Sequence, residues 1–443
     1  MKITPAFSLS NLERKIYYKF SLFANSAEIR YDRREYRTIQ GEYRTIQGEY
    51  MRISKKRFWA VLLLSLAALV AGCSQENHQA ERKLSSFEPK EVKELRKKEV
   101  AQSDGERSEY FFQQLPEEEQ RIYREILEGV QQYQEQIYVS SADNEAIDKT
   151  YHAILRDHPE VFWIHNRETT YKTVYSTYTV FEPGYQIGQD EIPAVESEME
   201  AAYQTVAGGL PENAGDYEKA KAVYEYVILN TNYGYSEDDQ SLAGVFRDHQ
   251  AVCAGYAGAV QYLLERLGVE CLYVTGDTQE SPDGHAWNIA NLNGTYYYLD
   301  ATNGDQPDFL QSEEAETVKD MVLYDYLCPF PEEYESMAQI HTEFSLPDCV
   351  DTEYNYYVRN GSCFEAYDSE AIYQYACQQI DQGSDMIQFK FRSRQSYEEA
   401  IADLIEGKAV EQIAQYYMSY YGMQQIEYHY GVLEDFNTIY FML

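Results

Sequence analysis

Three residues in the middle of the chain, Cys253, His285 and Asp300, are of the types that together carry out nucleophilic acyl transfer. In such a site a thiolate attacks a carbonyl, an imidazole holds or takes the thiol proton, and a carboxylate fixes the imidazole tautomer. Each residue alone has an ordinary explanation, because free Cys is a common core residue, a lone His is usually a satisfied polar group, and Asp at a strand end usually caps a turn. Their joint occurrence in this order makes acyl transfer the hypothesis to follow.

The surrounding pattern predicts the elements that position these residues. Cys253 opens the segment CAGYAGAVQYLLERLG, a predicted buried helix that ends at Gly268, and the unpaired N–H groups and dipole of a helix start stabilise a thiolate. His285 starts a predicted strand and Asp300 ends the neighbouring one, so a hairpin would bring imidazole and carboxylate side by side. The predicted strands cover 269–276, 285–293 and 294–302.

Residues 215–305 resemble the transglutaminase-like superfamily, papain-like cysteine enzymes with a Cys-His-Asp triad on a helix packed against an antiparallel sheet. The matching segments are AVCAGYAGAVQYLLERLGV, YVTG, GHAWN and YYYLDAT, with VYEYVILNTNYGYSEDD upstream. The resemblance implies an α+β fold, with Cys253 as the nucleophile, His285 as the general base and Asp300 as the residue that orients it.

The sequence departs from the family pattern beside the triad. Ala and Val precede the nucleophile where a Gly commonly stands, and Asn303 follows the Asp-x-Thr segment where Trp is frequent. Both differences alter the cleft, so the substrate class does not follow from the resemblance.

The oxyanion donors are less clear from the sequence than the triad. The backbone N–H of Cys253 is the natural first donor, and Tyr235 and Gln250 are candidates for the second. Trp287 either forms a wall of the cleft or packs against the sheet.

The segment 51–72 has the three-part layout of an export signal: basic residues through Arg57, an apolar run, and small residues before Cys73. This end resembles a bacterial lipobox, which implies cleavage before Cys73 and lipid attachment to it. The alternative is an uncleaved anchor helix, but the apolar run is short for a bilayer. Both alternatives place the body outside the cytoplasm, on the extracytoplasmic face of the cell membrane.

Fifty residues precede this signal, and they contain EYRTIQG twice in tandem, at 35–41 and 42–48. The repeat has no apolar heptad pattern and is not a coiled coil. We expect translation to begin at Met51, with 1–50 an upstream extension read as protein. Replacing Met51 with Ala should then abolish the exported protein, and normal export of that variant would contradict the hypothesis.

The predicted order of segments after the signal is a disordered tether at 73–107, a mainly helical N-terminal region at 108–210, the catalytic core at 211–310 and a small α+β domain at 311–443. The helical region has apolar positions from Ile122 to Ile137 at helical spacing and a predicted strand at 170–181. The last domain has predicted strands and helices but shows no catalytic constellation; they cover 387–391, 396–405, 410–420, 426–430 and 438–443.

Composition excludes several classes of partner. The net charge is −37, and the first 72 residues are basic, so the body is still more acidic and repels nucleic-acid phosphates. No His-x-x-x-His, Cys-x-x-Cys or Asp-x-Asp-x-Asp-Gly spacing supports a metal site, and no cofactor is expected. Seven cysteines, less Cys73 and Cys253, leave an odd number that cannot all pair.

These patterns favour an exported, membrane-anchored transglutaminase-like cysteine enzyme that acts on peptide amides, with hydrolysis as the favoured outcome. Its partner would be a peptide or protein substrate, with cell-wall peptide among the candidates. The alternatives are an amine-transferring protein crosslinker and a non-catalytic cell-surface binding or scaffold module.

Overall fold

The computed structural model describes residues 88–100, 109–164, 170–279, 281, 284–305 and 321–443. All of them belong to one compact unit that runs from Gln79 to Leu443. Within these ranges, no helix combines the length and apolarity needed to cross a bilayer. The expected extension at 1–50, the signal peptide at 51–72 and the lipidation site Cys73 lie outside the described residues.

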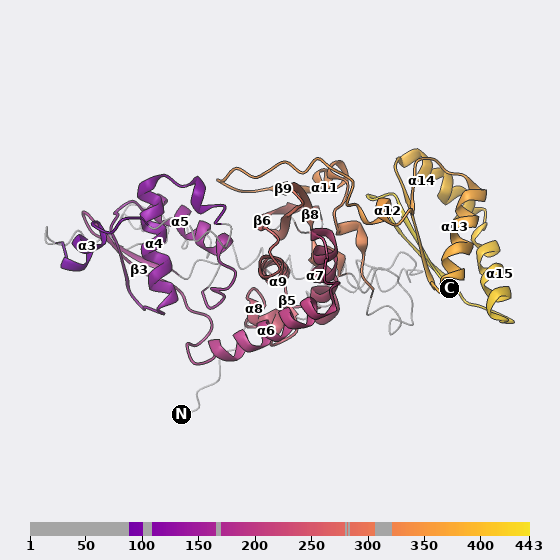
Figure 1. Ribbon diagram of the computed structural model, residues 1–443. Helices are drawn as coiled ribbons and strands as arrows, with labels where there is room; N and C mark the ends of the chain where they lie inside the picture. The colour runs from indigo at the N-terminus through magenta and orange to yellow at the C-terminus, as the bar shows by residue number, and fades with distance from the viewer. Residues whose placement is uncertain (1–87, 101–108, 165–169, 280, 282–283, 306–320) are drawn as a thin grey trace, which may run out of the picture. The chain divides into compact units, whose positions relative to one another are not determined.

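The region before the core combines helices with a small antiparallel sheet of strand order β1-β3-β2. Its elements are α3 (Lys90–Leu95), η1 (Phe112–Gln114), α4 (Glu117–Gln131), β1 (Ile137–Val139), α5 (Asn144–Asp157), β2 (Tyr171–Val174), β3 (Thr179–Glu182) and α6 (Ile192–Gly209) (Figure 1). Helix α3 lies inside the predicted tether, and its Val92 is fully buried. Ordered structure therefore begins earlier in the chain than the sequence predicted.

Two predicted elements of this region are divided in the structure. The helical spacing that ran on to Ile137 stops at Gln131, because Tyr133 adopts a left-handed backbone conformation with φ of 56°. Ile137 instead lies in β1, opposite Phe181. The single strand expected at 170–181 is a hairpin of β2 and β3.

The core places the cysteine-bearing helix against an antiparallel sheet, which confirms the predicted α+β class. Its elements are α7 (Asp216–Asn230), β4 (Asn232–Tyr233), α8 (Leu242–Phe246), β5 (Gln250–Ala251), α9 (Cys253–Arg266), β6 (Cys271–Thr278), β7 (His285–Leu292), β8 (Thr295–Leu299) and α10 (Ala301–Gly304), followed by η3 (Tyr324–Tyr326), α11 (Pro331–Met337) and β9 (Ala338–Ile340). Helix α9 packs on β6 and β7, and the strand order is β8-β7-β6-β9.

Helix α9 is buried over ten consecutive residues, from Gly255 to Leu264. Small side chains allow this depth: a Cβ on Gly255 would lie 2.8 Å from the carbonyl oxygen of Asp239. The helix ends just before Gly268, whose φ of 79° suits glycine at such a terminus. The first turn of α9, which carries Cys253, therefore packs closely against the loop that contains Asp239.

The sheet of the core extends past the boundary predicted at residue 310. Strand β9 pairs antiparallel with β6, from Gly276 opposite Ile340 to Thr278 opposite Ala338. On the other side, β8 ends at Leu299, and Asp300 caps α10 by accepting the backbone N–H of Asn303. The triad carboxylate thus sits at a strand-to-helix turn.

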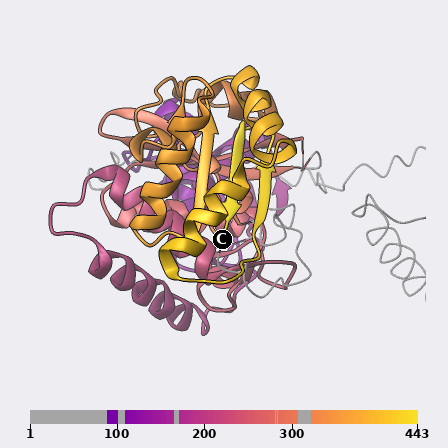
Figure 2. The same ribbon diagram turned by 90° about the vertical axis from the view of Figure 1, so that its right-hand side faces the viewer.

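The C-terminal part forms a second sheet of order β10-β11-β13-β12, with β10 parallel to β11 and the other pairs antiparallel. Its elements are α12 (Tyr356–Arg359), β10 (Cys363–Phe364), α13 (Ser369–Asp381), β11 (Met386–Phe391), α14 (Arg394–Ala400), η4 (Ile401–Glu406), α15 (Val410–Tyr421), β12 (His429–Leu433) and β13 (Thr438–Met442). Figure 2 shows α13, α14 and α15 covering one face of this sheet. The sequence pattern did not predict α13.

A substitution at Gly276 can test how tightly the core sheet is packed. A Cβ there would overlap the carbonyl oxygen of Gln339 in β9 and lie 2.7 Å from Cη2 of Trp287. We expect Gly276→Ala to lower the free energy of unfolding by about 1–3 kcal/mol, measured by urea denaturation. Gly208→Ala is the control, because its Cβ would meet no atom within 4 Å on helix α6 and should stabilise by up to ~1 kcal/mol. Equal effects of the two substitutions would contradict the packing described here.

Candidate active site

Cys253 is the first residue of α9 and is partly exposed. The chain is held on both sides of it: the Val252 N–H donates to the carbonyl of Asp239 at 2.9 Å, and the Gly234 N–H donates to the carbonyl of Ala251 at 3.0 Å. Strands β4 and β5 pair in parallel in this same loop. The thiol therefore emerges from a fixed turn at a helix start, where backbone N–H groups have no partner within the helix.

His285 begins β7 and is 5% exposed. Its Nε2 lies 2.9 Å from Oδ2 of Asp300, and Cys253 is close enough to the same imidazole to contribute to its pKa. Because Nε2 faces the carboxylate, Nδ1 is the ring nitrogen left for the thiol. The structure thus brings the three residues singled out in the sequence into one chain of contacts.

Asp300 has no exposed surface and receives hydrogen bonds from several directions. Its Oδ2 accepts from the hydroxyl of Tyr334 and from Nδ2 of Asn303, each at 2.9 Å, besides His285. Its Oδ1 accepts the backbone N–H of Asn303 at 3.1 Å. Both carboxylate oxygens are therefore occupied, so the orientation of the group is fixed.

The electrostatics of the pair favour a charged imidazole. Burial lowers the pKa of His285, but the charge and hydrogen bond of Asp300, with the Cys253 contact, outweigh burial and raise the pKa to about 10. An imidazolium next to a thiol stabilises the thiolate. The arrangement therefore places a positively charged imidazole beside the Cys253 thiol at neutral pH.

Trp287 supports the imidazole instead of lining an open cleft. The indole is 1% exposed and stacks on the His285 ring, with centroids 5.7 Å apart and an interplanar angle of 24°. The ring of Tyr334 also meets the indole edge-on, with centroids 5.9 Å apart. Of the two roles considered for Trp287, the structure shows packing.

The two candidates for a second oxyanion donor are tied to each other. Nε2 of Gln250 donates to the backbone carbonyl of Tyr235 at 3.0 Å, and the Tyr235 side chain is 82% exposed. The Gln250 amide thus holds the loop, and no described contact fixes either side chain over the thiol.

Three residues near the triad were not assigned a role from the sequence. Tyr233 lies near the thiol. Burial and the charge of Cys253 raise the pKa of the Tyr233 hydroxyl. Asn303, noted only as a departure from the family, holds the carboxylate, as does Tyr334 from a different segment. The hydrogen-bonding side chain of Asn303 beside Asp300 was a usable signal; nothing distinguished Tyr334 among 44 tyrosines.

In the described part of the chain, no group of three or more His, Cys, Asp or Glu side chains is placed to hold a metal ion. The six cysteines within these residues are all free thiols.

Comparison with known proteins agrees with this geometry. Residues 204–301 match the model of the transglutaminase-like superfamily, and this segment contains Cys253, His285 and Asp300. Two curated relatives, the kyphoscoliosis peptidases of Mus musculus and Homo sapiens, are each 26% identical over 117 residues, which is 23% of this chain. The match spans 18% of each relative's length. A solved structure of a TGase is 13% identical, with a TM-score of 0.24 over 38% of this chain and 50% of its own. The segment 204–301 is a transglutaminase-like domain.

The carboxylate's effect on the imidazole can be measured directly. Asp300→Asn removes the negative charge beside His285, so the imidazole pKa should fall from about 10 toward its ordinary value of 6.5. At pH 8 the ring would then be neutral in the variant and protonated in the parent protein, as read from ring-nitrogen NMR shifts. Asp277→Asn is the control, because it removes the carboxylate of the exposed His341–Asp277 pair and should leave the His285 titration unchanged. An unaltered His285 titration in Asp300→Asn would refute the assignment.

Proposed function

We propose that this chain is an exported, lipid-anchored cysteine enzyme that hydrolyses peptide amides through a thioester on Cys253. The observation that carries the proposal is the continuous contact from the Cys253 thiol through His285 to a fully buried Asp300. Buried, multiply hydrogen-bonded carboxylates that fix an imidazole are typical of nucleophilic sites. Export and anchoring rest on the basic, apolar and small residues that lead to Cys73.

The first half of the reaction forms the acyl-enzyme. The Cys253 sulfur attacks the amide carbonyl, a C–S bond forms, and the carbonyl electron pair moves to oxygen. The backbone N–H of Cys253 stabilises that oxyanion, because N–H groups of the first helical turn lack intrahelical partners. The His285 imidazolium then donates its proton to the departing nitrogen, and the C–N bond breaks to leave a thioester.

In the second half, neutral His285 accepts a proton from water as the water oxygen attacks the thioester carbonyl. The C–S bond breaks and the thiolate returns beside the imidazolium. Asp300 stays hydrogen-bonded to Nε2 in both halves, so Nδ1 performs each proton transfer. The carboxylate product and the earlier amine product together balance one water molecule consumed.

Two alternatives lead to different products. If a primary amine resolves the thioester, the protein is a crosslinker, and labelled amine would enter protein without peptide cleavage. If the site does not react, the protein is a surface binding or scaffold module. Hydrolysis is favoured because peptide, cell-wall stem peptide and surface protein are the substrates that an exported, tethered protein meets.

The reactivity of the thiol tests the proposal before any substrate is known. In the full-length protein we expect iodoacetamide to label Cys253 quickly, with the rate persisting well below the ordinary thiol pKa of about 8.5. His285→Ala should lose this reactivity, because the imidazolium that stabilises the thiolate is gone. Residue-resolved mass spectrometry supplies the rate, with buried Cys271 and partly buried Cys377 as internal references. Labelling of Cys253 as slow as the references, or equal in the variant, would favour the binding-module alternative.

A further inference from the structure

Helix α11, which lies outside the segment that matches the family, carries two adjacent side chains with different partners. The Tyr334 hydroxyl donates to Oδ2 of Asp300 at 2.9 Å, and its ring is 1% exposed. The ring stacks on Tyr298, with centroids 4.9 Å apart. Glu333, the preceding residue, accepts from the ammonium of Lys390 at 2.8 Å. One short helix therefore connects the triad carboxylate to the C-terminal sheet.

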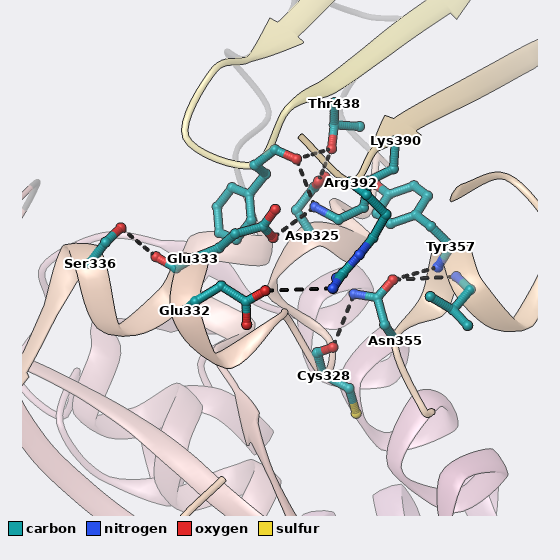
Figure 3. A network of polar contacts seen from close by, with 12 residues as sticks. Asp325, Cys328, Glu332, Glu333, Ser336, Asn355, Tyr357, Lys390, Arg392 and Thr438 are labelled. Atoms are coloured by element: carbon teal, nitrogen blue, oxygen red, sulfur yellow. Dashed lines mark hydrogen bonds and ion pairs between the residues drawn. The ribbon is translucent and has the colours of Figure 1, made fainter. Parts of the chain in front are cut away.

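Lys390 is an unusual strand residue because it has no exposed surface. Its ammonium lies between Glu333 and the carbonyl oxygen of Phe436, which accepts at 2.7 Å (Figure 3). Three aromatic rings, those of Phe330, Tyr357 and Phe436, surround the ammonium at 5.0, 5.7 and 5.4 Å. A buried ammonium needs such partners, and removing one of them is costly.

The strands around Lys390 present two different faces. Ile387, Phe389 and Phe391 of β11 belong to the apolar core beneath the helices, whereas Gln388 and Lys390 alternate with them toward the opposite face. In β13, Thr438 and Tyr440 alternate in the same way with Ile439 and Phe441. These polar residues are buried, so this second face of the sheet is covered.

A second buried acid, Asp325, contacts the same polar face of the C-terminal sheet. Asp325 of η3 is 1% exposed and accepts hydrogen bonds from Thr438, Tyr357 and Tyr440. At the edge of the contact, Arg392 lies 3.7 Å from Glu332 (Figure 3). The Arg392 guanidinium also lies over the ring of Phe330. The contacts of the sheet thus converge on η3 and α11, the segment that presents Tyr334 to the triad.

We propose that Tyr334 is a positioning residue for Asp300, and that the C-terminal sheet holds it in place through the ion pair of Lys390 with Glu333. The inference deepens the proposed function and rests on it. Its consequence is that the C-terminal part contributes to the active site without supplying a group that touches the substrate.

The hydroxyl of Tyr334 is tested by Tyr334→Phe, which keeps the ring. We expect Cys253 alkylation at pH 8 to slow by about two- to fourfold, because a thiol with the ordinary pKa of about 8.5 is already about one-quarter thiolate at that pH. The low-field Nε2–H resonance of His285 should also shift, because its carboxylate partner is no longer fixed. Tyr298→Phe is the matched control: it removes a buried hydroxyl from the ring stacked on Tyr334, one that donates to Glu335 and not to the triad.

Outcomes for the two proposals are separable. If Cys253 of the parent protein is unreactive, the proposed function fails, while the His285 resonance still reports on Tyr334. If the parent thiol is reactive and Tyr334→Phe matches Tyr298→Phe in both rate and resonance, the positioning role is overturned.

The ion pair is tested by the double variant Lys390→Met with Glu333→Met, since apolar replacement of a whole buried pair preserves folding better than loss of one partner. At pH 8 Glu333 is ionised in the parent protein, because burial raises its pKa to about 7 although Lys390 lowers it. We expect alkylation to slow by a factor similar to that of Tyr334→Phe, with no further loss when the three substitutions are combined. Arg394→Met, which removes an exposed C-terminal charge paired with Glu398 and Glu434, is the control.

Multiplicative losses in the triple variant would show that the ion pair does not act through Tyr334, and would overturn that part of the proposal. The single variant Lys390→Arg keeps the charge and serves as a rescue, with a rate closer to the parent than that of the double variant. Near-UV circular dichroism of each protein confirms that the compared proteins are folded.

Discussion

The buried carboxylate of Asp300 is the constraint on which the rest of the site depends. A carboxylate without water is tolerated only where hydrogen-bond donors converge on it. Here the donors come from three elements: His285 from β7, Asn303 from α10 and Tyr334 from α11. The strand-to-helix turn after β8, the pairing of β7 with β8 and the position of α11 must therefore all be correct at once. Cys253 lies on helix α9, whose small residues let its first turn approach the loop and the sheet.

The triad and the elements that carry it could be predicted because their signals are local. Gly255 and the alanines of α9 mark a deeply buried helix, and the alternating strands from Cys271 to Leu299 mark an antiparallel sheet. Contacts between distant segments gave no such signal. Tyr334 reaches Asp300 from a helix that shows no sequence pattern of its own, and Gln250 uses its amide for a loop carbonyl, a choice that residue type cannot reveal.

The role of the C-terminal part was harder to predict, because the polar residues that alternate with apolar ones along its strands do not face water. A polar residue at every second position normally predicts a face in water. In β11 and β13 these positions hold Lys390, Thr438 and Tyr440, and all three are buried against η3, α11 and α12. The sequence showed several of the elements but not that the polar face was covered, so it suggested an independent unit with no part in the chemistry.

Strand β9 has a practical consequence for anyone who divides this chain. A fragment that stops at the end of the family match would lose β9 and leave Gly276, Asp277 and Thr278 of β6 without their ladder partners. An open strand edge of this kind is a template for pairing with other chains, so such a fragment would tend to aggregate. Poor solubility of the excised segment would then reflect a missing edge strand, and would say nothing about the chemistry of its cysteine.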